Sequence, residues 1–313
     1  MVPPSLVAEF SPFVAPFVKF AEDLVHLNPI LLQLLLLALL LGGVYALSAL
    51  GLTMIFGVMD IINFAHGAFI TVGIYLVWVL YTSSGINPLA LIPIAAIGLF
   101  AVGALVYRGV VDPLIEAPQE SQLVAMFGVS LIIASSLAIL FKNNPRSLGI
   151  HMGIVILGPA SFGVDKLIVL GITLVTMLGV WLFLMRTRTG LVIRGTADDR
   201  GSAEFVGIDV RSINRLTFGI GAALAGLAGG SIALIQQFDP YTGELYLINA
   251  FVIVVLGGLG SFPGSLVGGM IVGFISIFGG YYFPGTVNQL VIYVLFVLIL
   301  LVRPGGIFGG EST

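Results

Sequence analysis

The chain has 313 residues, of which 58% are hydrophobic and 9% are charged, and its mean hydropathy is +1.15. A soluble domain keeps roughly a quarter of its residues charged, so this composition excludes an ordinary soluble protein and predicts an integral membrane protein. The net charge of −3 and the absence of a long basic run exclude a nucleic-acid partner. Zero cysteines exclude disulfides and thiolate ligands, and the three histidines have no metal-binding spacing, so no metal site is expected.

Residues 1–28 precede the first long apolar stretch. They have no basic region ahead of an apolar core, so we do not expect a cleaved signal peptide. Their large apolar residues recur at intervals of three and four, at Phe10, Phe13, Phe17, Phe20 and Leu24. This spacing predicts a helix with an aromatic stripe, which favours an extracytoplasmic or interfacial segment, with docking of a partner as the alternative.

Residues 29–313 contain apolar stretches of about 20 residues, the length that crosses a membrane as a helix. Nine candidates are present, at 30–57, 61–81, 89–107, 122–141, 166–185, 215–236, 246–260, 264–283 and 286–302. The stretches are continuous rather than alternating, so we expect an all-α, polytopic transmembrane bundle with about eight or nine membrane segments. Glycines interrupt the first stretch at Gly42-Gly43 and the seventh at 257–264, so both are expected to be broken or re-entrant.

Lysine and arginine in the short loops predict the orientation, because cytoplasmic loops carry the excess of positive charge. Arg108, six arginines in 186–215 and Arg303 fall on one side of nine alternating spans. The other side has four basic residues, Lys19, Lys142, Arg146 and Lys166. We therefore expect the first group of loops and the C-terminus in the cytoplasm, and the N-terminus outside.

Few ionisable residues lie near the predicted spans. A charge at that depth costs on the order of 3 kcal/mol, so each is a functional candidate. Asn63 and His66 are one helical turn apart at the start of the second span, where they would line the inner end of a transport path. A structural role for His66, bonded to a backbone carbonyl, is favoured over contact with a substrate. The candidates for the path are Asn63, His66, Gly67, Gly42, Gly43, Gly257 and Gly258.

None of the predicted spans has a charged residue in its middle. Ion-coupled transporters normally carry such residues, and a membrane enzyme needs a cluster of them, so the energy for transport is expected from a partner. The place for that partner is segment 186–215, the one cytoplasmic loop long enough to hold its own structure. Residues 196–208 predict a short helix that ends at Gly207 and presents charge and Phe205 to the partner. The alternative is a positive loop without a partner.

Three regions together resemble the LivH-like permease subunits of bacterial ABC importers for branched-chain amino acids. They are Gly43 to Gly67, Arg194 to Phe218, and Val255 to Gly264 with the closing Arg303 to Gly309. The similarity extends over nearly the whole chain from about residue 33, and the Asn-Phe-Ala-His-Gly and Gly-Gly-Leu-Gly-Ser segments carry most of its specificity. Ala68 stands where the family often has an acidic residue, and the N-terminal segment is longer than expected.

The resemblance implies a transport subunit, not an enzyme, in the bacterial cytoplasmic (inner) membrane. It implies a LivM-like second permease, two LivF/LivG-like ATPase subunits and an extracytoplasmic solute-binding protein as partners. It implies no cofactor in this chain, because ATP and Mg would bind the ATPase subunits. Segment 194–208 looks like the coupling helix of such permeases, with Ala203 to Gly207 matching an Ala-x-x-x-Gly core. The coupling residues it implies are Arg194, Ala203, Glu204, Phe205, Gly207 and Ile208.

We therefore expect an ATP-driven importer subunit that moves branched-chain or related hydrophobic amino acids by alternating access. One alternative is a relative that carries urea or a short-chain amide, because specificity rests largely with the binding protein. The other alternative is an ion-coupled secondary transporter or channel that works alone.

Overall fold

The computed structural model describes residues 4–26, 28–150, 152–158, 160–283, 285–302 and 305–308. Its helices are α1 (Pro4–Val25), α2 (Ile30–Met59), α3 (His66–Ser84), α4 (Pro88–Val106), α5 (Gln119–Phe141), α6 (Val164–Arg186), α7 (Arg188–Asp198), α8 (Arg200–Phe205), α9 (Val210–Ile235), α10 (Thr242–Gly257), α11 (Phe262–Tyr282) and α12 (Gly285–Val302). Two irregular helical turns, η1 (Tyr107–Val111) and η2 (Asp112–Leu114), continue α4.

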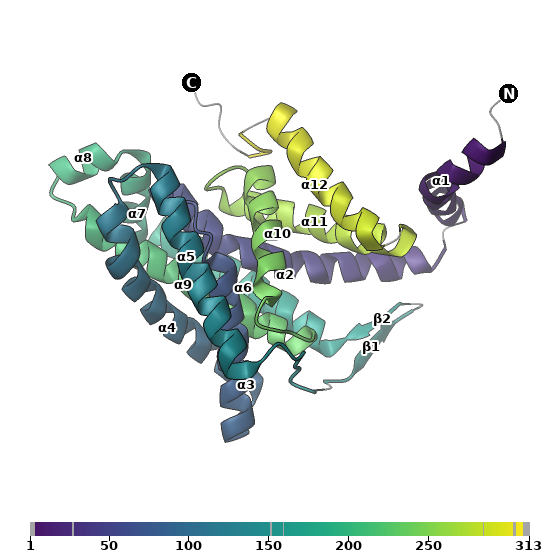
Figure 1. The fold of residues 1–313 in the computed structure, drawn as a ribbon, viewed down its shortest axis with the longest axis horizontal. Helices are drawn as coiled ribbons and strands as arrows, with labels where there is room; N and C mark the ends of the chain where they lie inside the picture. The colour runs from purple at the N-terminus through teal and green to yellow at the C-terminus, as the bar shows by residue number, and fades with distance from the viewer. Residues whose placement is uncertain are drawn as a thin grey trace.

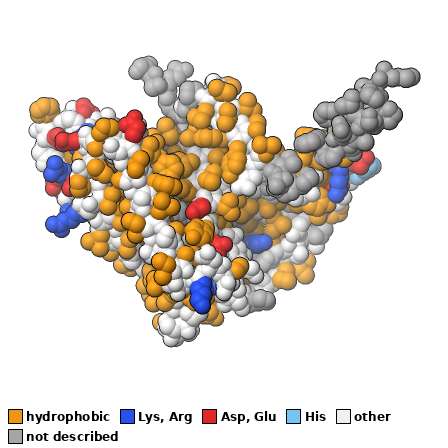
Figure 2. All heavy atoms as spheres, viewed as in Figure 1, with side chains coloured by type: hydrophobic (Ala, Val, Ile, Leu, Met, Phe, Trp, Pro, Cys, Tyr) orange, Lys and Arg blue, Asp and Glu red, His pale blue; other side chains and the backbone are white. Residues whose placement is uncertain are grey.

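Seven of the described helices are long and apolar enough to cross a membrane, with α4, η1 and η2 counted as one. Two shorter apolar helices, α10 and residues 289–302 of α12, coincide with the other two predicted spans. The expected all-α polytopic bundle is therefore confirmed. Figure 2 shows hydrophobic side chains over most of one face, with a group of charged side chains at the end that carries α7 and α8. A bundle covered in this way is suited to lipid.

Helices α2 and α9 hold the bundle together (Figure 1). α9 packs against α4, α3 and α2, and α2 packs in addition against α11, α10 and α6. These contacts depend on small residues: a Cβ atom added to Gly73 of α3 would lie 2.9 Å from the Cα atom of Gly226 in α9. Lipid solvates apolar side chains as well as a neighbouring helix does, so association rests on this close packing.

The predicted interruption at Gly42-Gly43 is wrong, because α2 runs through both residues as one helix. The glycines serve packing instead. A Cβ atom on Gly42 would lie 2.9 Å from the Cα atom of Met270 in α11, and one on Gly43 would lie 2.8 Å from Cδ1 of Leu170 in α6. The helix stays intact because backbone groups at membrane depth must be hydrogen-bonded, and the glycines let two neighbours approach it.

The start of the second predicted span is also different in the structure. α2 ends at Asp60, which has a left-handed backbone with φ of 53°, and α3 begins only at His66. Asn63 therefore lies in the non-helical connection, not on a helical face shared with His66. Hydropathy placed the gap between the two spans correctly but started the second span five residues too early, because most residues of the connection after Asp60 are apolar.

The predicted interruption at 257–264 is present as the tight connection between α10 and α11. α10 ends at Gly257, and Gly258 and Gly260 have φ values of 98° and 79°, a backbone region that favours glycine. The side chain of Ser261 accepts a hydrogen bond from the Gly264 N–H at 3.1 Å, which caps the start of α11.

The predicted N-terminal helix is present as α1, and its last turns contact the end of α11. The ring of Phe17 lies 5.1 Å from that of Phe283, and Phe20 lies 5.4 Å from Tyr282. The Tyr282 hydroxyl donates a hydrogen bond of 2.8 Å to Asp23. The described half of the aromatic stripe therefore packs against the bundle. The side chains of Phe10 and Phe13, and all of Arg303, lie outside the described residues.

A small hairpin before α6 was not predicted. Strands β1 (Ile154–Leu157) and β2 (Ala160–Gly163) pair antiparallel, with Leu157 opposite Ala160. The side chain of Gln33 in α2 fixes this hairpin, because it accepts a hydrogen bond from the Ser161 N–H and donates one to the Ser161 carbonyl, both at 2.6 Å. A four-residue strand is too short for a hydropathy pattern to reveal.

Candidate functional site

Segment 186–215 forms helical structure of its own, as predicted. After α6 the chain turns at Thr187, whose hydroxyl accepts a hydrogen bond from the Gly190 N–H at 3.0 Å and caps α7. α8 then stands at the edge of the molecule, and α9 returns to the bundle (Figure 1).

Both ends of α8 are capped by local hydrogen bonds. At its start, Asp199 accepts a hydrogen bond of 3.0 Å from the Ser202 N–H and another from the Ser202 hydroxyl. These bonds stabilise the carboxylate and lower the pKa of Asp199, the hydroxyl having the larger effect. At its end, the Ile208 N–H donates to the Ala203 carbonyl at 3.1 Å and the Gly207 N–H donates to that of Glu204 at 3.0 Å. This is the Schellman arrangement, and it requires the positive φ of 85° at Gly207.

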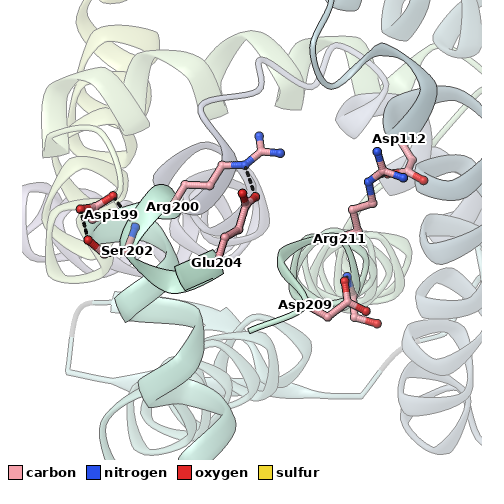
Figure 3. A network of polar contacts seen from close by, with 8 residues as sticks. Asp112, Asp199, Arg200, Ser202, Glu204, Asp209 and Arg211 are labelled. Atoms are coloured by element: carbon pink, nitrogen blue, oxygen red, sulfur yellow. Dashed lines mark hydrogen bonds and ion pairs between the residues drawn. The ribbon is translucent and has the colours of Figure 1, made fainter. Parts of the chain in front are cut away.

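The outer side of α8 exposes apolar surface. Phe205 is 94% exposed and Val206 is 77% exposed, whereas Ala203 is only 5% exposed and faces the protein. Glu204 forms an exposed ion pair with Arg200 at 3.3 Å (Figure 3). An exposed pair of this kind contributes little to stability, whereas Phe205 and Val206 together form an apolar patch that the described residues leave uncovered.

Arg194 has a different position from the other predicted coupling residues. Its Nε donates a hydrogen bond of 3.1 Å to the carbonyl of Leu184 at the end of α6. The preceding residue, Ile193, is fully buried in a cluster with Leu184, Met54 of α2 and Leu224 of α9. Arg194 and Ile193 thus fix α7 to three helices of the bundle, which sequence reasoning did not foresee.

Beyond α8, Arg211 at the start of α9 faces Asp112 of η2, and its Nε lies 4.0 Å from Oδ1 of Asp112 (Figure 3). The start of α9 therefore lies beside the end of α4, and α8 lies between α7 and α9, which both pack against α2.

Two of the predicted path residues have structural hydrogen bonds. His66 is fully buried, and its Nε2 donates to the Ser48 carbonyl of α2 at 2.8 Å. Asn63 is also fully buried, and its side-chain oxygen accepts a hydrogen bond from the Ala65 N–H at 3.0 Å, just before α3 begins. Both side chains fix the connection between α2 and α3, as the structural interpretation of His66 proposed.

The glycines among the path candidates lie at helix contacts. Gly67 meets α10, where a Cβ atom on it would be 2.8 Å from the Cβ atom of Leu247. Gly257 packs against Gly264 at the connection of α10 and α11. The seven path candidates are spread over the middle of α2, the start of α3 and the end of α10, so the structure does not gather them around one cavity.

The glycine-rich connection instead meets the end of the chain, which sequence analysis did not predict. The N–H groups of Ile307 and Phe308 donate to the carbonyls of Leu256 and Gly257, at 2.8 and 3.2 Å. These carbonyls end α10 and would otherwise lack partners, so the C-terminal segment caps that helix. The two parts of the third region that resembles the family are therefore joined in the structure.

Two of the cavities among the described residues lie between helices of the bundle. One, of about 370 Å³, lies between the end of α2, α7 and the α10–α11 connection, next to Arg194 and Asp198. The other, of about 330 Å³, lies between α2, α10, α11 and α12 and has a polar lining. Sequence reasoning missed the second one; the signal was the isolated neutral polar residues Asn249, Ser276 and Gln289 within apolar stretches.

The described residues form a polytopic helical bundle whose long apolar helices have no acidic or basic residue in their middle, and they present an exposed, capped helix, α8, between α7 and α9, which defines a multi-pass membrane protein. Residues 34–300 match the family described as branched-chain amino acid transport system, permease component. The chain belongs to this family, and the LivH-like resemblance is confirmed.

Two relatives, BraD and LivH, support the assignment. The chain is 32% identical over 295 residues to the high-affinity branched-chain amino acid transport system permease protein BraD of Pseudomonas aeruginosa, covering 89% of this chain and 95% of BraD. It is 31% identical over 287 residues to the permease protein LivH of Salmonella typhimurium, covering 86% and 92%. A solved structure, PsaBC from Streptococcus pneumoniae in complex with Fab, matches with a TM-score of 0.48 at 16% identity, covering 93% of this chain and 98% of that one.

Proposed function

We propose that this chain is the permease subunit of an ATP-driven importer in a bacterial inner membrane, which moves branched-chain or related hydrophobic amino acids into the cytoplasm. The solute class is supported by the relatives BraD and LivH, which are named as branched-chain amino acid permeases. The partners in this proposal are a LivM-like second permease, two LivF/LivG-like ATPase subunits that bind ATP and Mg, and an extracytoplasmic solute-binding protein.

The observation that carries the proposal is α8. A six-residue helix is too short to be stable alone, yet this one is capped at both ends and held between α7 and α9, which both pack against α2. Its 94% exposed Phe205 has no partner surface among the described residues, and a rigid aromatic residue beside charges is typical of an interface anchor. α8 is therefore the proposed docking element for an ATPase subunit.

The packing of α7 offers a route for transmitting movement. Ile193 is buried against α2, α6 and α9, and Arg194 ties α7 to the last turn of α6. A displacement of α8 by the ATPase would move α7 as a rigid body against these helices, which is how packed elements switch between two arrangements. The cavity of about 370 Å³ between α7 and α2 leaves room for that shift.

The proposal is tested by replacing Phe205 with Asp in the complete transporter. We expect weaker association of the ATPase subunits and at least a tenfold loss of ATP-driven uptake, since loss of a buried anchor commonly costs 2 kcal/mol or more, where about 1.4 kcal/mol is tenfold. The matched control is Ile156→Asp, which places the same charge on another exposed apolar residue, in β1, that is 75% exposed.

The ATPase subunits should co-purify with the Ile156→Asp protein in normal amounts. Normal co-purification and uptake by the Phe205→Asp protein would refute the docking role. The solute is tested separately with the purified complex in vesicles: ATP-dependent uptake of leucine, isoleucine or valine supports the proposal, whereas uptake of urea or acetamide instead, or uptake without ATP, contradicts it.

A further inference from the structure

The cavity between α2, α10, α11 and α12 differs from the rest of the bundle in its lining. It lies at the end of the bundle away from α8, because one of its residues, Gln236, directly follows α9. Figure 1 shows α12 crossing next to α10 and α11, above α2. The polar lining residues are all uncharged, and they are Tyr45, Gln236, Tyr246, Asn249, Ser276 and Gln289.

Asn249 is the most informative of these residues. It lies in the middle of α10 and is 8% exposed, and its amide group forms no hydrogen bond with another described residue. The amide atoms of Asn249 are not among the fully buried polar atoms that lack a partner, so they face the open space of the cavity and are available there to a hydrogen-bond partner. The cavity is polar enough to supply one as water or as solute.

The other walls combine polar and aliphatic surface. The rings of Tyr45 and Tyr246 lie 5.9 Å apart and form one side. Leu41, Leu245 and Ile292 provide the aliphatic part of the lining. The volume of about 330 Å³ is within the range of small-molecule sites, which starts near 300 Å³.

This lining matches a small zwitterion with an aliphatic side chain. The amide and hydroxyl groups of the lining can form hydrogen bonds with both a carboxylate and an ammonium group. The leucine and isoleucine side chains of the lining can pack against an aliphatic side chain. The absence of charge from the lining also suits transport, because a solute on a path must bind weakly enough to leave.

We propose that this cavity is a contact site for the transported amino acid, with Asn249 and Ser276 facing its polar end and Leu41 and Ile292 its aliphatic side chain. This inference rests on the proposed function, and it adds a specific place on the path. It places solute contact on α10 and α11, away from the predicted candidates Asn63 and His66.

The test uses the complete transporter in vesicles, supplied with ATP and leucine-loaded binding protein. Asn249→Leu keeps a side chain of similar size and removes the amide. We expect leucine uptake to fall about tenfold, because one to two hydrogen bonds to the solute are lost. ATP hydrolysis should stay within about twofold of the wild type. Uptake per ATP therefore falls about tenfold. Ser136→Ala on α5 removes a membrane hydroxyl away from the cavity and should leave this ratio unchanged.

An Asn249→Leu protein with the wild-type ratio of uptake to ATP hydrolysis would overturn the inference while leaving the proposed function intact. A wild-type complex that does not take up leucine, isoleucine or valine would instead overturn the proposed function, and with it the identity of the solute here.

A second variant guards against a folding defect. The chain has no cysteine, so Asn249→Cys provides its only thiol. We expect leucine to slow modification of this thiol by a small reagent at least threefold during turnover, and to have no effect on Ile156→Cys, whose parent side chain on β1 is 75% exposed and lies outside the membrane spans. Equal modification rates of the Asn249→Cys protein with and without leucine would also overturn the inference.

Discussion

Gly207 shows how one residue shapes the proposed coupling surface. Its φ of 85° lets the chain leave α8 with both hydrogen bonds of the Schellman arrangement, and no atom lies within 4 Å of the place where a Cβ atom would stand. The glycine is therefore required for backbone conformation, not for space. An L-residue in this conformation costs roughly 1–2 kcal/mol, less for asparagine.

We predict that ATP-driven uptake is highest for the wild type, lower for Gly207→Asn and lowest for Gly207→Val. The valine variant should lose about tenfold in uptake but remain inserted in the membrane. The control is Gly201→Ala within α8, which sits in ordinary helical geometry and should retain wild-type uptake. Uptake is measured in vesicles per inserted transporter. Wild-type uptake by Gly207→Val would count against a role of α8 geometry in coupling.

His66 is predicted to act on stability rather than on the solute. Its Nε2–H bonds the Ser48 carbonyl, and its ring is fully buried next to Gly51. We expect His66→Ala to lower the free energy of unfolding by about 2 kcal/mol, through the lost bond and the space left behind. The half-saturating concentration of leucine-loaded binding protein should change less than twofold. A thermally normal protein that has lost uptake would assign His66 to the transport path instead.

At the scale of elements, the C-terminal segment and the α10–α11 connection depend on each other. Gly306 has a φ of 75° and approaches the backbone of Gly258 and Val255 too closely for any side chain. Without this contact, the last carbonyls of α10 would lose the N–H groups of Ile307 and Phe308.

We predict that Gly306→Ala destabilises the folded permease by at least 2 kcal/mol, because it adds steric overlap to the cost of the left-handed backbone. Gly149→Ala is the matched control, since Gly149 has a φ of 64° but no atom near the added carbon, so it should cost only about 1 kcal/mol. Thermal unfolding in detergent measures both. Equal losses for the two variants would show that the segment does not pack on α10.

The elements also show how far sequence reasoning reached. Hydropathy located the membrane helices because lipid imposes one requirement, continuous apolar surface, on every span. Hydropathy could not show that Gly42 and Gly43 lie within an intact helix. A glycine that breaks a helix has the same hydropathy as a glycine that lets a neighbouring helix such as α11 approach. Hydropathy also starts the second span at residue 61 instead of His66, since apolar residues in a connection look the same as apolar residues in a helix.

The candidate site was predictable where it depends on local sequence. Acidic residues, small residues and Gly207 in order predict α8 and its end, and the structure contains that helix. The sequence could not show that the side chain of Arg194 points toward the bundle, because the carbonyl that it bonds lies ten residues earlier in the chain, in α6. The polar cavity was not predictable either, since it depends on which faces of four helices meet.

At the scale of the whole molecule, charge and apolar surface are separated. Hydrophobic side chains cover the described spans, and charges gather where α7, α8 and the start of α9 extend from them (Figure 2). A bundle without charged residues at depth has no group of its own to couple transport to an ion gradient. We therefore predict that uptake requires ATP hydrolysis by a partner and persists when proton and sodium gradients are collapsed, as measured in sealed vesicles. Gradient-driven uptake without ATP would contradict this.

The most direct test of this account is photo-crosslinking from position 205 in the assembled transporter. A photoreactive residue in place of Phe205 should form crosslinks to an ATPase subunit in high yield, whereas one in place of Ile156 on β1 should form none. Crosslinking of position 205 only to lipid or to the permease itself, in a preparation that contains the ATPase subunits, would contradict the claim that α8 receives the force for transport.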